Sequence, residues 1–208
     1  MDSLTGRVET ITRDVSRVPS RVSTTVGLAL LLSVFAFSVL QPVHADDPVF
    51  NTSKNISNNP GNANGPQIAV SGNNVYVAWR ENSDIYFRAS TNNGGTFGGT
   101  TNLSNNAGTS QAPRIAAFGD NVYVLWQDNT PGNNDIFFKK SANNGTSFGS
   151  LVNLSLDGFD SGGALSNLDL AAFSGGAYAV WQDDDDQAVT DIDMIFRKVY
   201  NNGTLGSK

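Results

Sequence analysis

Apolar and polar positions alternate in short runs that recur along the chain. The run Asn74–Trp79 (NVYVAW) returns as Asn121–Trp126 (NVYVLW) and, in altered form, as Gly176–Trp181 (GAYAVW). The tryptophans that end these runs are 47 and 55 residues apart. Self-similarity at a spacing of about fifty residues indicates a repeat architecture. We therefore predict three similar units, at about 50–100, 101–151 and 152–208.

Each unit contains short stretches rich in β-branched and aromatic residues and separated by Gly, Asn and Pro, which is typical of β-strands. In the first unit we expect strands at 67–70, 75–79 and 85–89, and a fourth strand after Phe97. The other two units follow the same order. No stretch after Ala45 shows the 3.6-residue period of an amphipathic helix, so the sequence predicts an all-β protein.

The second strand of each unit is apolar on both faces. In the first unit Val75 and Val77 point one way and Tyr76 points the other. Such a strand lies in a sheet that is covered on both sides, and four-stranded sheets stacked in this way are the blades of a β-propeller. We predict three four-stranded propeller-type blades, and rank a two-layer sandwich second because most of its strands would keep one polar face. The predicted blade-core residues are Trp79, Trp126 and Trp181.

The number of units leaves the assembly open. Residues 50–57 align with 97–104, so the first unit is preceded by a fourth strand that could complete the last sheet. Three sheets are fewer than the usual four to eight. The chain is therefore a piece of a longer array, half of a six-bladed ring made by two copies, or an open stack of three. An open stack leaves flanks bare and favours self-association.

The first 45 residues differ in character from the repeats. Four arginines between positions 7 and 21 precede an uncharged apolar run, 26–40, and Pro42 and Val43–Ala45 follow it. This order is typical of a secretory signal peptide, with cleavage after Ala45. The alternative is an uncleaved membrane anchor, although the run is shorter than the roughly 20 residues that span a bilayer. We expect 46–208 to be secreted or exposed at the cell surface.

Composition excludes several kinds of chemistry. The net charge is −6, and it becomes −7 without the leader, which carries four basic and three acidic residues. An acidic chain repels phosphate backbones, so nucleic acid is not an expected partner. The single histidine, His44, would leave with the leader, and the chain has no cysteine. Disulfides and thiolate metal sites are therefore excluded.

A Gly- and Asn-rich segment lies where the third strand must turn back into the fourth. Its Asn can cap downstream backbone N–H groups, its Gly supplies a positive φ, and its aromatic ring can fix the register. The motif residues are Ser90, Asn92, Gly94, Thr96 and Phe97 in the first unit, and Ser141, Asn143, Gly145, Ser147 and Phe148 in the second. The third unit keeps Asn201 and Gly203, with Leu205 and Gly206 at the positions of the hydroxyl and the aromatic residue.

This motif resembles the Asp-box, or bacterial neuraminidase repeat, of the sialidase-like β-propellers, which reads Ser-x-Asp-x-Gly-x-Thr-aromatic. Asn92 and Asn143 stand where that pattern has Asp. The stretch from Phe50 to Leu205 is also similar to exported tandem-repeat proteins of archaea that are often labelled exo-α-sialidase. The resemblance implies a sialidase-like propeller in which these turns are structural staples at the periphery, away from any active site.

The resemblance also makes sialidase activity a hypothesis to be weighed. The sialidases that this chain resembles use an arginine triad for the substrate carboxylate, a Tyr–Glu nucleophile pair and an Asp acid. Arg88 and Arg197 occupy equivalent or near-equivalent places in third strands, which indicates a structural role, and Glu81 is expected on a loop with no Tyr partner marked. We assign no catalytic residue. We expect a surface module that binds glycans or proteins through loops at one rim, or a structural role; the alternative is an exo-α-sialidase-type hydrolase.

An acidic run follows the second strand of the third unit. Its carboxylates could hold Ca²⁺, which binds several oxygen ligands, but their spacing matches no loop with defined ligand positions. The alternative is a solvated loop between two strands. The residues of this run are Asp183, Asp184, Asp185 and Asp186. No other cofactor is expected.

Overall fold

The computed structural model describes residues 52–155, 167–183 and 193–206. The chain divides into two compact units, Met1–Thr52 and Ser53–Lys208, and the strands of the described residues lie in the second unit. The expected leader and the tail of the acidic run, 184–186, lie outside the described residues. Only Ser53–Lys208 is therefore considered below.

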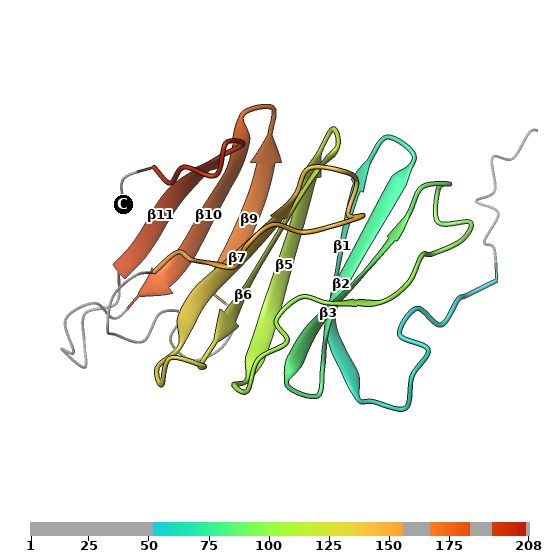
Figure 1. Ribbon diagram of the computed structural model, residues 1–208, viewed down its shortest axis with the longest axis horizontal. Helices are drawn as coiled ribbons and strands as arrows, with labels where there is room; N and C mark the ends of the chain where they lie inside the picture. Colours follow the sequence, from blue (N-terminus) through green and yellow to red (C-terminus); the bar gives the residue numbers. More distant parts are fainter. Residues whose placement is uncertain (1–51, 156–166, 184–192, 207–208) are drawn as a thin grey trace, which may run out of the picture. The chain divides into compact units, whose positions relative to one another are not determined.

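This unit consists of three antiparallel sheets whose strands follow chain order, and its described residues contain no helix (Figure 1). None of the described segments is thus a helix that could cross a membrane. The all-β class and the propeller-type sheets predicted from the sequence are confirmed. Sheet 1 contains β1 (Ala63–Ser71), β2 (Asn74–Glu81), β3 (Asp84–Ser90) and β4 (Thr101–Asn102). Sheet 2 contains β5 (Ser110–Phe118), β6 (Asn121–Asp128), β7 (Asp135–Ser141) and β8 (Val152–Asn153), and sheet 3 contains β9 (Leu168–Phe173), β10 (Gly176–Asp183) and β11 (Asp193–Tyr200).

The fourth strands are shorter than expected, and among the described residues sheet 3 has three strands rather than four. β4 ends after two residues because the Asn102 side chain accepts a hydrogen bond from the backbone N–H of Asn105, at 2.9 Å, and turns the chain. In sheet 3, Leu205 makes a single antiparallel bridge to Val199 at the outer side of β11. Sheets 1 and 2 thus have the four strands expected, and sheet 3 has three in the part of the chain that the structure describes.

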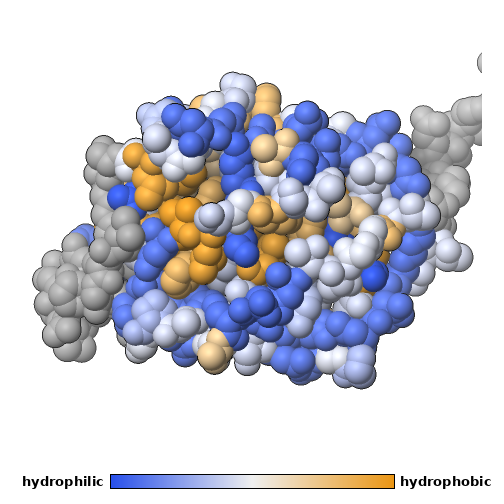
Figure 2. Space-filling model, viewed as in Figure 1, coloured by the Kyte–Doolittle hydropathy of each residue, from blue (hydrophilic) through white to orange (hydrophobic). Residues whose placement is uncertain are grey.

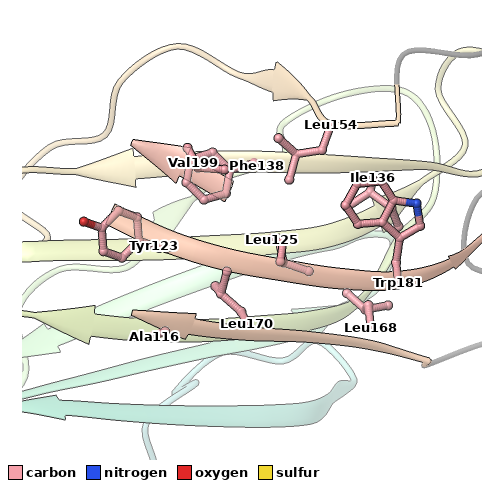
Figure 3. Close-up of a cluster of buried hydrophobic side chains, with 12 residues drawn as sticks. Ala116, Tyr123, Leu125, Ile136, Phe138, Leu154, Leu168, Leu170, Trp181 and Val199 are labelled. Atoms are coloured by element: carbon pink, nitrogen blue, oxygen red, sulfur yellow. The ribbon is translucent and has the colours of Figure 1, made fainter. Parts of the chain in front are cut away.

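The sheets stack through their faces, and β6 lies in the middle of the stack. Every residue of β6 from Val122 to Asp128 is buried. One face of β6 packs against sheet 1 through Val124 and Trp126. The other face packs against sheet 3 through Tyr123 and Leu125 (Figure 3). The two apolar faces of the second strand thus each meet a neighbouring sheet, which is the arrangement that the sequence pattern indicated.

Residues 53–57 lie where a preceding sheet would have its fourth strand. The guanidinium of Arg88 in β3 donates a hydrogen bond of 2.7 Å to the carbonyl of Ile56. Arg197 in β11 donates in the same way to the carbonyl of Leu154, which follows the fourth strand of sheet 2. Within one chain, therefore, this segment lies against sheet 1, and the expectation that it completes sheet 3 is wrong for a single copy.

We expect the core of sheet 2 to carry much of the stability. Replacing Leu125, which is fully buried, by Ala should lower the free energy of unfolding by about 2–5 kcal/mol, because methylene contacts are lost and a cavity remains. Leu151→Ala is the matched control, since Leu151 is 41% exposed. Urea unfolding of both variants tests this expectation. Equal losses for the two variants would show that the sheets are not packed as described.

Candidate functional site

The two ends of the strands form two different edges of the stack. Because neighbouring strands are antiparallel, the turns after first and third strands lie at one edge and the turns after second strands lie at the other. We call the first the turn edge; it contains Ser90–Phe97 and Ser141–Phe148. We call the second the carboxylate edge; it contains Glu81, Asp128 and Asp183.

The motif residues of the turn edge close each turn with side chains. Asn92 Oδ1 accepts hydrogen bonds from Ser90 Oγ, at 2.9 Å, and from the N–H of Thr96, at 2.8 Å. The N–H of Gly94, whose φ is +76°, donates to Ser90 Oγ. Asn92 Nδ2 also donates to Thr96 Oγ1 at 3.0 Å. An Asp at this position could only accept a bond from that hydroxyl, so Asn reverses the direction of one bond and keeps the turn.

The second turn repeats these bonds. Asn143 Oδ1 accepts from Ser141 Oγ and from the N–H of Ser147, and Asn143 Nδ2 donates to Ser147 Oγ. The ring of Phe148 packs edge-on against Phe87 of sheet 1, with centroids 4.9 Å apart. The turn of one sheet thus contributes to the packing of the sheet before it.

The third turn is one residue shorter than the sequence comparison suggested. The N–H of Gly206 donates to the carbonyl of Lys198 at 2.7 Å. The residues that make this bond in the other sheets are Gly98 and Gly149, which follow the aromatic residues of the motif. Leu205, rather than Gly206, therefore occupies the aromatic position, and it packs against the core between sheets 2 and 3. The prediction that Gly206 occupies the position of the aromatic residue is therefore wrong.

Two equivalent grooves lie between neighbouring turns. Each has a buried phenylalanine of a third strand and the hydroxyls and amides of the turns in its lining, and each has a volume of about 520–540 Å³, within the range of small-molecule sites. The first groove is lined by Phe87, Thr91, Thr96, Phe97, Asn144 and Gly145 among others, and the second by Phe138, Lys140, Ala142, Asn143, Phe148 and Asn201 among others. Figure 2, in the same view as Figure 1, shows hydrophobic residues in the region where Figure 1 labels β7 and β11.

The lining of these grooves is almost uncharged. Among the described residues that line them, the only titratable side chain is that of Lys140. Burial lowers the pKa of the Lys140 amine, and this amine donates a hydrogen bond of 2.6 Å to the carbonyl of Asn201 in the next sheet. The grooves therefore offer aromatic surface, amides and hydroxyls, but no carboxylate for proton transfer.

At the carboxylate edge, the second strand of each sheet ends in a buried tryptophan–carboxylate pair. The indole Nε1 donates a hydrogen bond of 3.1–3.2 Å to a carboxylate two residues further along the strand. The six side chains are at most 4% exposed. The spacing works because residues two apart lie on the same face of a strand. The pairs are Trp79 with Glu81, Trp126 with Asp128, and Trp181 with Asp183.

The pair in sheet 2 has the densest set of hydrogen bonds. Asp128 Oδ2 accepts from Ser110 Oγ at 2.6 Å and from Asn106 Nδ2 at 2.7 Å, and Oδ1 accepts from the N–H of Thr130 at 2.9 Å. Burial by itself raises the pKa of this carboxyl, but the hydrogen bonds, those of Ser110 and Thr130 foremost, outweigh it and hold the pKa below its ordinary value. The carboxylate is therefore a fixed structural anion.

The other carboxylates considered from the sequence take similar places. Glu81 does not lie on a loop as expected; it ends β2, is 4% exposed, and accepts hydrogen bonds from Trp79 and Asn59. The carboxylate of Asp183 already accepts the bond from Trp181, and the rest of the acidic run lies outside the described residues. Among the residues that are described, no three His, Cys, Asp or Glu side chains are close enough to share a metal ion.

Two arginines tie neighbouring sheets together instead of facing a shared site. As described above, Arg88 donates a hydrogen bond to the carbonyl of Ile56, and Arg197 donates one to the carbonyl of Leu154.

A further hollow lies beside β9 and β10 on the exposed face of sheet 3. Its lining includes Asp169, Gln182 and Met194, together with Arg114 of β5. We call it the inner hollow. It combines one arginine with one carboxylate.

Comparison with known proteins adds a likeness of fold. No family model matches the chain, and no curated protein matches it in sequence. A K499G mutant of NanB sialidase from Streptococcus pneumoniae aligns with a TM-score of 0.48 and 10% identity over 70% of this chain and 22% of the sialidase. A xylan β-1,4-xylosidase from Bacillus halodurans C-125 aligns with a TM-score of 0.47 and 15% identity over 72% of this chain and 31% of the xylosidase.

This chain thus spans about a fifth to a third of the length of those two structures. A GH43 endo-arabinanase from Bacillus licheniformis aligns with a TM-score of 0.34 and 11% identity over 68% of this chain and 76% of the arabinanase. With TM-scores below 0.5, we draw nothing from these alignments about activity.

The hydrogen bonds of Asp128 predict a pH dependence of stability. Because its pKa is lower in the folded chain than in the unfolded one, its contribution is complete above the ordinary carboxyl range and is lost as the pH falls through the folded pKa. Asp128→Asn should lower the free energy of unfolding at about pH 7 by about 1.5–3 kcal/mol. The variant should also lose less stability than the wild type between about pH 7 and pH 3.

Urea unfolding at both pH values measures these effects. Asp120→Asn is the control, since Asp120 is an exposed acid in a turn of the same sheet, and it should leave stability nearly unchanged. If Asp128→Asn were as stable as the wild type at neutral pH, the anchoring role of the carboxylate would be wrong.

Proposed function

We propose that this chain is an exported, non-catalytic propeller-type module that binds glycans in the two grooves of its turn edge. One observation carries the proposal: the grooves present aromatic, amide and hydroxyl groups with no carboxylate in the described lining. The carboxylate that ends the second strand of each sheet is buried at the opposite edge, where it accepts a tryptophan hydrogen bond.

The chemistry of the grooves suits an uncharged sugar chain. Aromatic rings such as Phe97 and Phe148 offer apolar surface to the C–H face of a sugar ring, and amides such as those of Asn143 and Asn144 offer donors and acceptors to its hydroxyls. The grooves also repeat, at successive sheet boundaries. A polymer of repeating sugars can occupy both grooves at once, and the second contact then gains from high effective concentration.

Hydrolysis of a sialoside is the second candidate, and the inner hollow is the observation that favours it. Arg114 could hold a substrate carboxylate there, and Asp169 could act as an acid. A glycosidase of the usual kind needs two carboxyl groups flanking the bond that is cleaved. The described lining of the inner hollow supplies one, so binding is the function that the geometry supports better.

A glycan array followed by calorimetry tests the proposal. We expect binding to neutral oligosaccharides, weakened about tenfold or more, equivalent to about 1.4 kcal/mol, by Thr91→Trp or Ala142→Trp. These exposed residues occupy equivalent positions in the two grooves, and a large ring there would fill the space. Ser83→Trp, at an exposed position of the carboxylate edge, is the matched control and should bind normally.

Two results would contradict the proposal. An array without any hit, or binding that both groove variants retain, would remove the grooves as the site and favour a protein ligand or a scaffold role. Turnover of a fluorogenic sialoside that is lost in Asp169→Asn would establish the hydrolase instead.

A further inference from the structure

The two outermost faces of the sheet stack are apolar and exposed. On sheet 1 the exposed face carries Ile68, which is 67% exposed, and Val70, which is 58% exposed; we call it flank 1. On sheet 3 the exposed face carries Met194, 69% exposed, and Phe196, 52% exposed; we call it flank 3. Large apolar side chains gathered on one face indicate an interaction surface.

The residues of flank 1 are buried wherever the same position occurs inside the stack. Ile68 is opposite Val77 in its sheet, and the corresponding residue of sheet 2, Ile115, is opposite Val124. The corresponding residue of sheet 3 is Leu170, opposite Ala179. Ile115 and Leu170 are each 9% exposed because the preceding sheet covers them. Flank 1 is therefore a receiving face, and no preceding sheet covers it among the described residues.

Flank 3 shows the converse. Phe196 corresponds to Phe138 of sheet 2 and Phe87 of sheet 1, which are 2% and 1% exposed because the following sheet covers them. Met194 corresponds in the same way to Ile136 and Ile85, and both of these are fully buried. The apolar residues of flank 3 are thus the counterparts of the side chains through which sheets 1 and 2 each contact the following sheet. The two flanks are complementary to each other.

Aromatic rings stack on one another across flank 3. The rings of Phe173 and Tyr178 are parallel with centroids 4.5 Å apart, and Tyr178 stacks on Phe196 at 5.5 Å. The amine of Lys198 lies over this patch, 5.7 Å from the ring of Tyr178. Its counterpart Lys140 reaches across to a turn carbonyl of the next sheet. By this correspondence, the amine of Lys198 would donate to a turn carbonyl of a sheet that packs on flank 3.

Residues 53–57 supply a second complementary feature. They lie against sheet 1 as the fourth strand of a preceding sheet would. Among the described residues, the edge of β11 that faces away from β10 is paired only near its end, where Thr204–Gly206 turn back onto Lys198–Tyr200. A sheet 3 that packed on sheet 1 of a second copy would find this segment beside β11. The pairing in sheet 2 of Phe138 with Val152 corresponds to pairing of Phe196 with Lys54 of that copy.

We propose that two copies of this chain close head to tail into a ring of six sheets. Flank 3 of each copy packs on flank 1 of the other, and residues 53–57 of each copy complete the third sheet of its partner. A head-to-tail contact either closes into a ring or grows into a filament. Two copies bring six sheets, which is within the usual range of propellers, and the closed form leaves neither flank exposed.

The solution mass tests the ring. The full chain, expressed with residues 1–45 in place so that any processing occurs, should have the mass of two copies at micromolar concentration in sedimentation or light scattering. Ile68→Asp or Phe196→Asp should each give a monomer, since each removes one half of the same contact. Phe118→Asp is the control: Phe118 is an exposed apolar residue, 47% exposed, at the end of β5, and this variant should remain a dimer.

Cysteine pairing tests the register of the contact. The chain has no cysteine, so Lys54→Cys with Phe196→Cys adds the only thiols, and neighbouring strands bring such residues within disulfide reach. Oxidation should give a covalent dimer and no larger species. Lys54→Cys with Phe118→Cys should stay uncrosslinked.

The opposite results overturn the proposal. These are a monomer for the full chain at every concentration, a dimer that neither flank variant disrupts, or a ladder of larger crosslinked species. Each is separate from the outcome of the glycan-binding test, because the turn grooves are formed within one copy.

Discussion

The stacking of one sheet face on the next is the interaction on which the rest of this structure depends. β6 shows it most clearly, because both of its faces are buried and its side chains pack on two different sheets. Without cysteine, disulfides are excluded, so the stability described here comes from this packing and from the backbone ladders. The same packing fixes where the turns meet, and hence where the grooves between them lie.

The acidic residues illustrate how the stack restricts chemistry. A buried carboxylate must be hydrogen-bonded, and the tryptophan two residues earlier supplies one bond in each sheet. These carboxylates, and the arginines that tie one sheet to the previous outer segment, hold the repeat together. What remains at the turn edge is largely neutral. The proposed binding role rests on this division between an anchoring edge and an open edge.

Much of the fold could be predicted from the sequence, because its strongest signals are local. The alternation in Asn74–Trp79 and its copies placed the second strands, and the Asn-Gly turns placed the reversals. Glu81 was misplaced because nothing local shows that β2 continues two residues past Trp79. Ala112 has φ of +51° at a bulge in β5, and only its correspondence with Gly65 could have indicated this. The grooves depend on contacts between sheets, which no single repeat encodes.

Hydrogen exchange of the backbone amides tests the stacking most directly. If both faces of β6 are covered as described, the amides of Val122–Asp128 should exchange only through global unfolding, and far more slowly than those of residues 53–57. If β6 exchanged as fast as residues 53–57, its faces would be open to solvent and the account of stacked sheets would be contradicted.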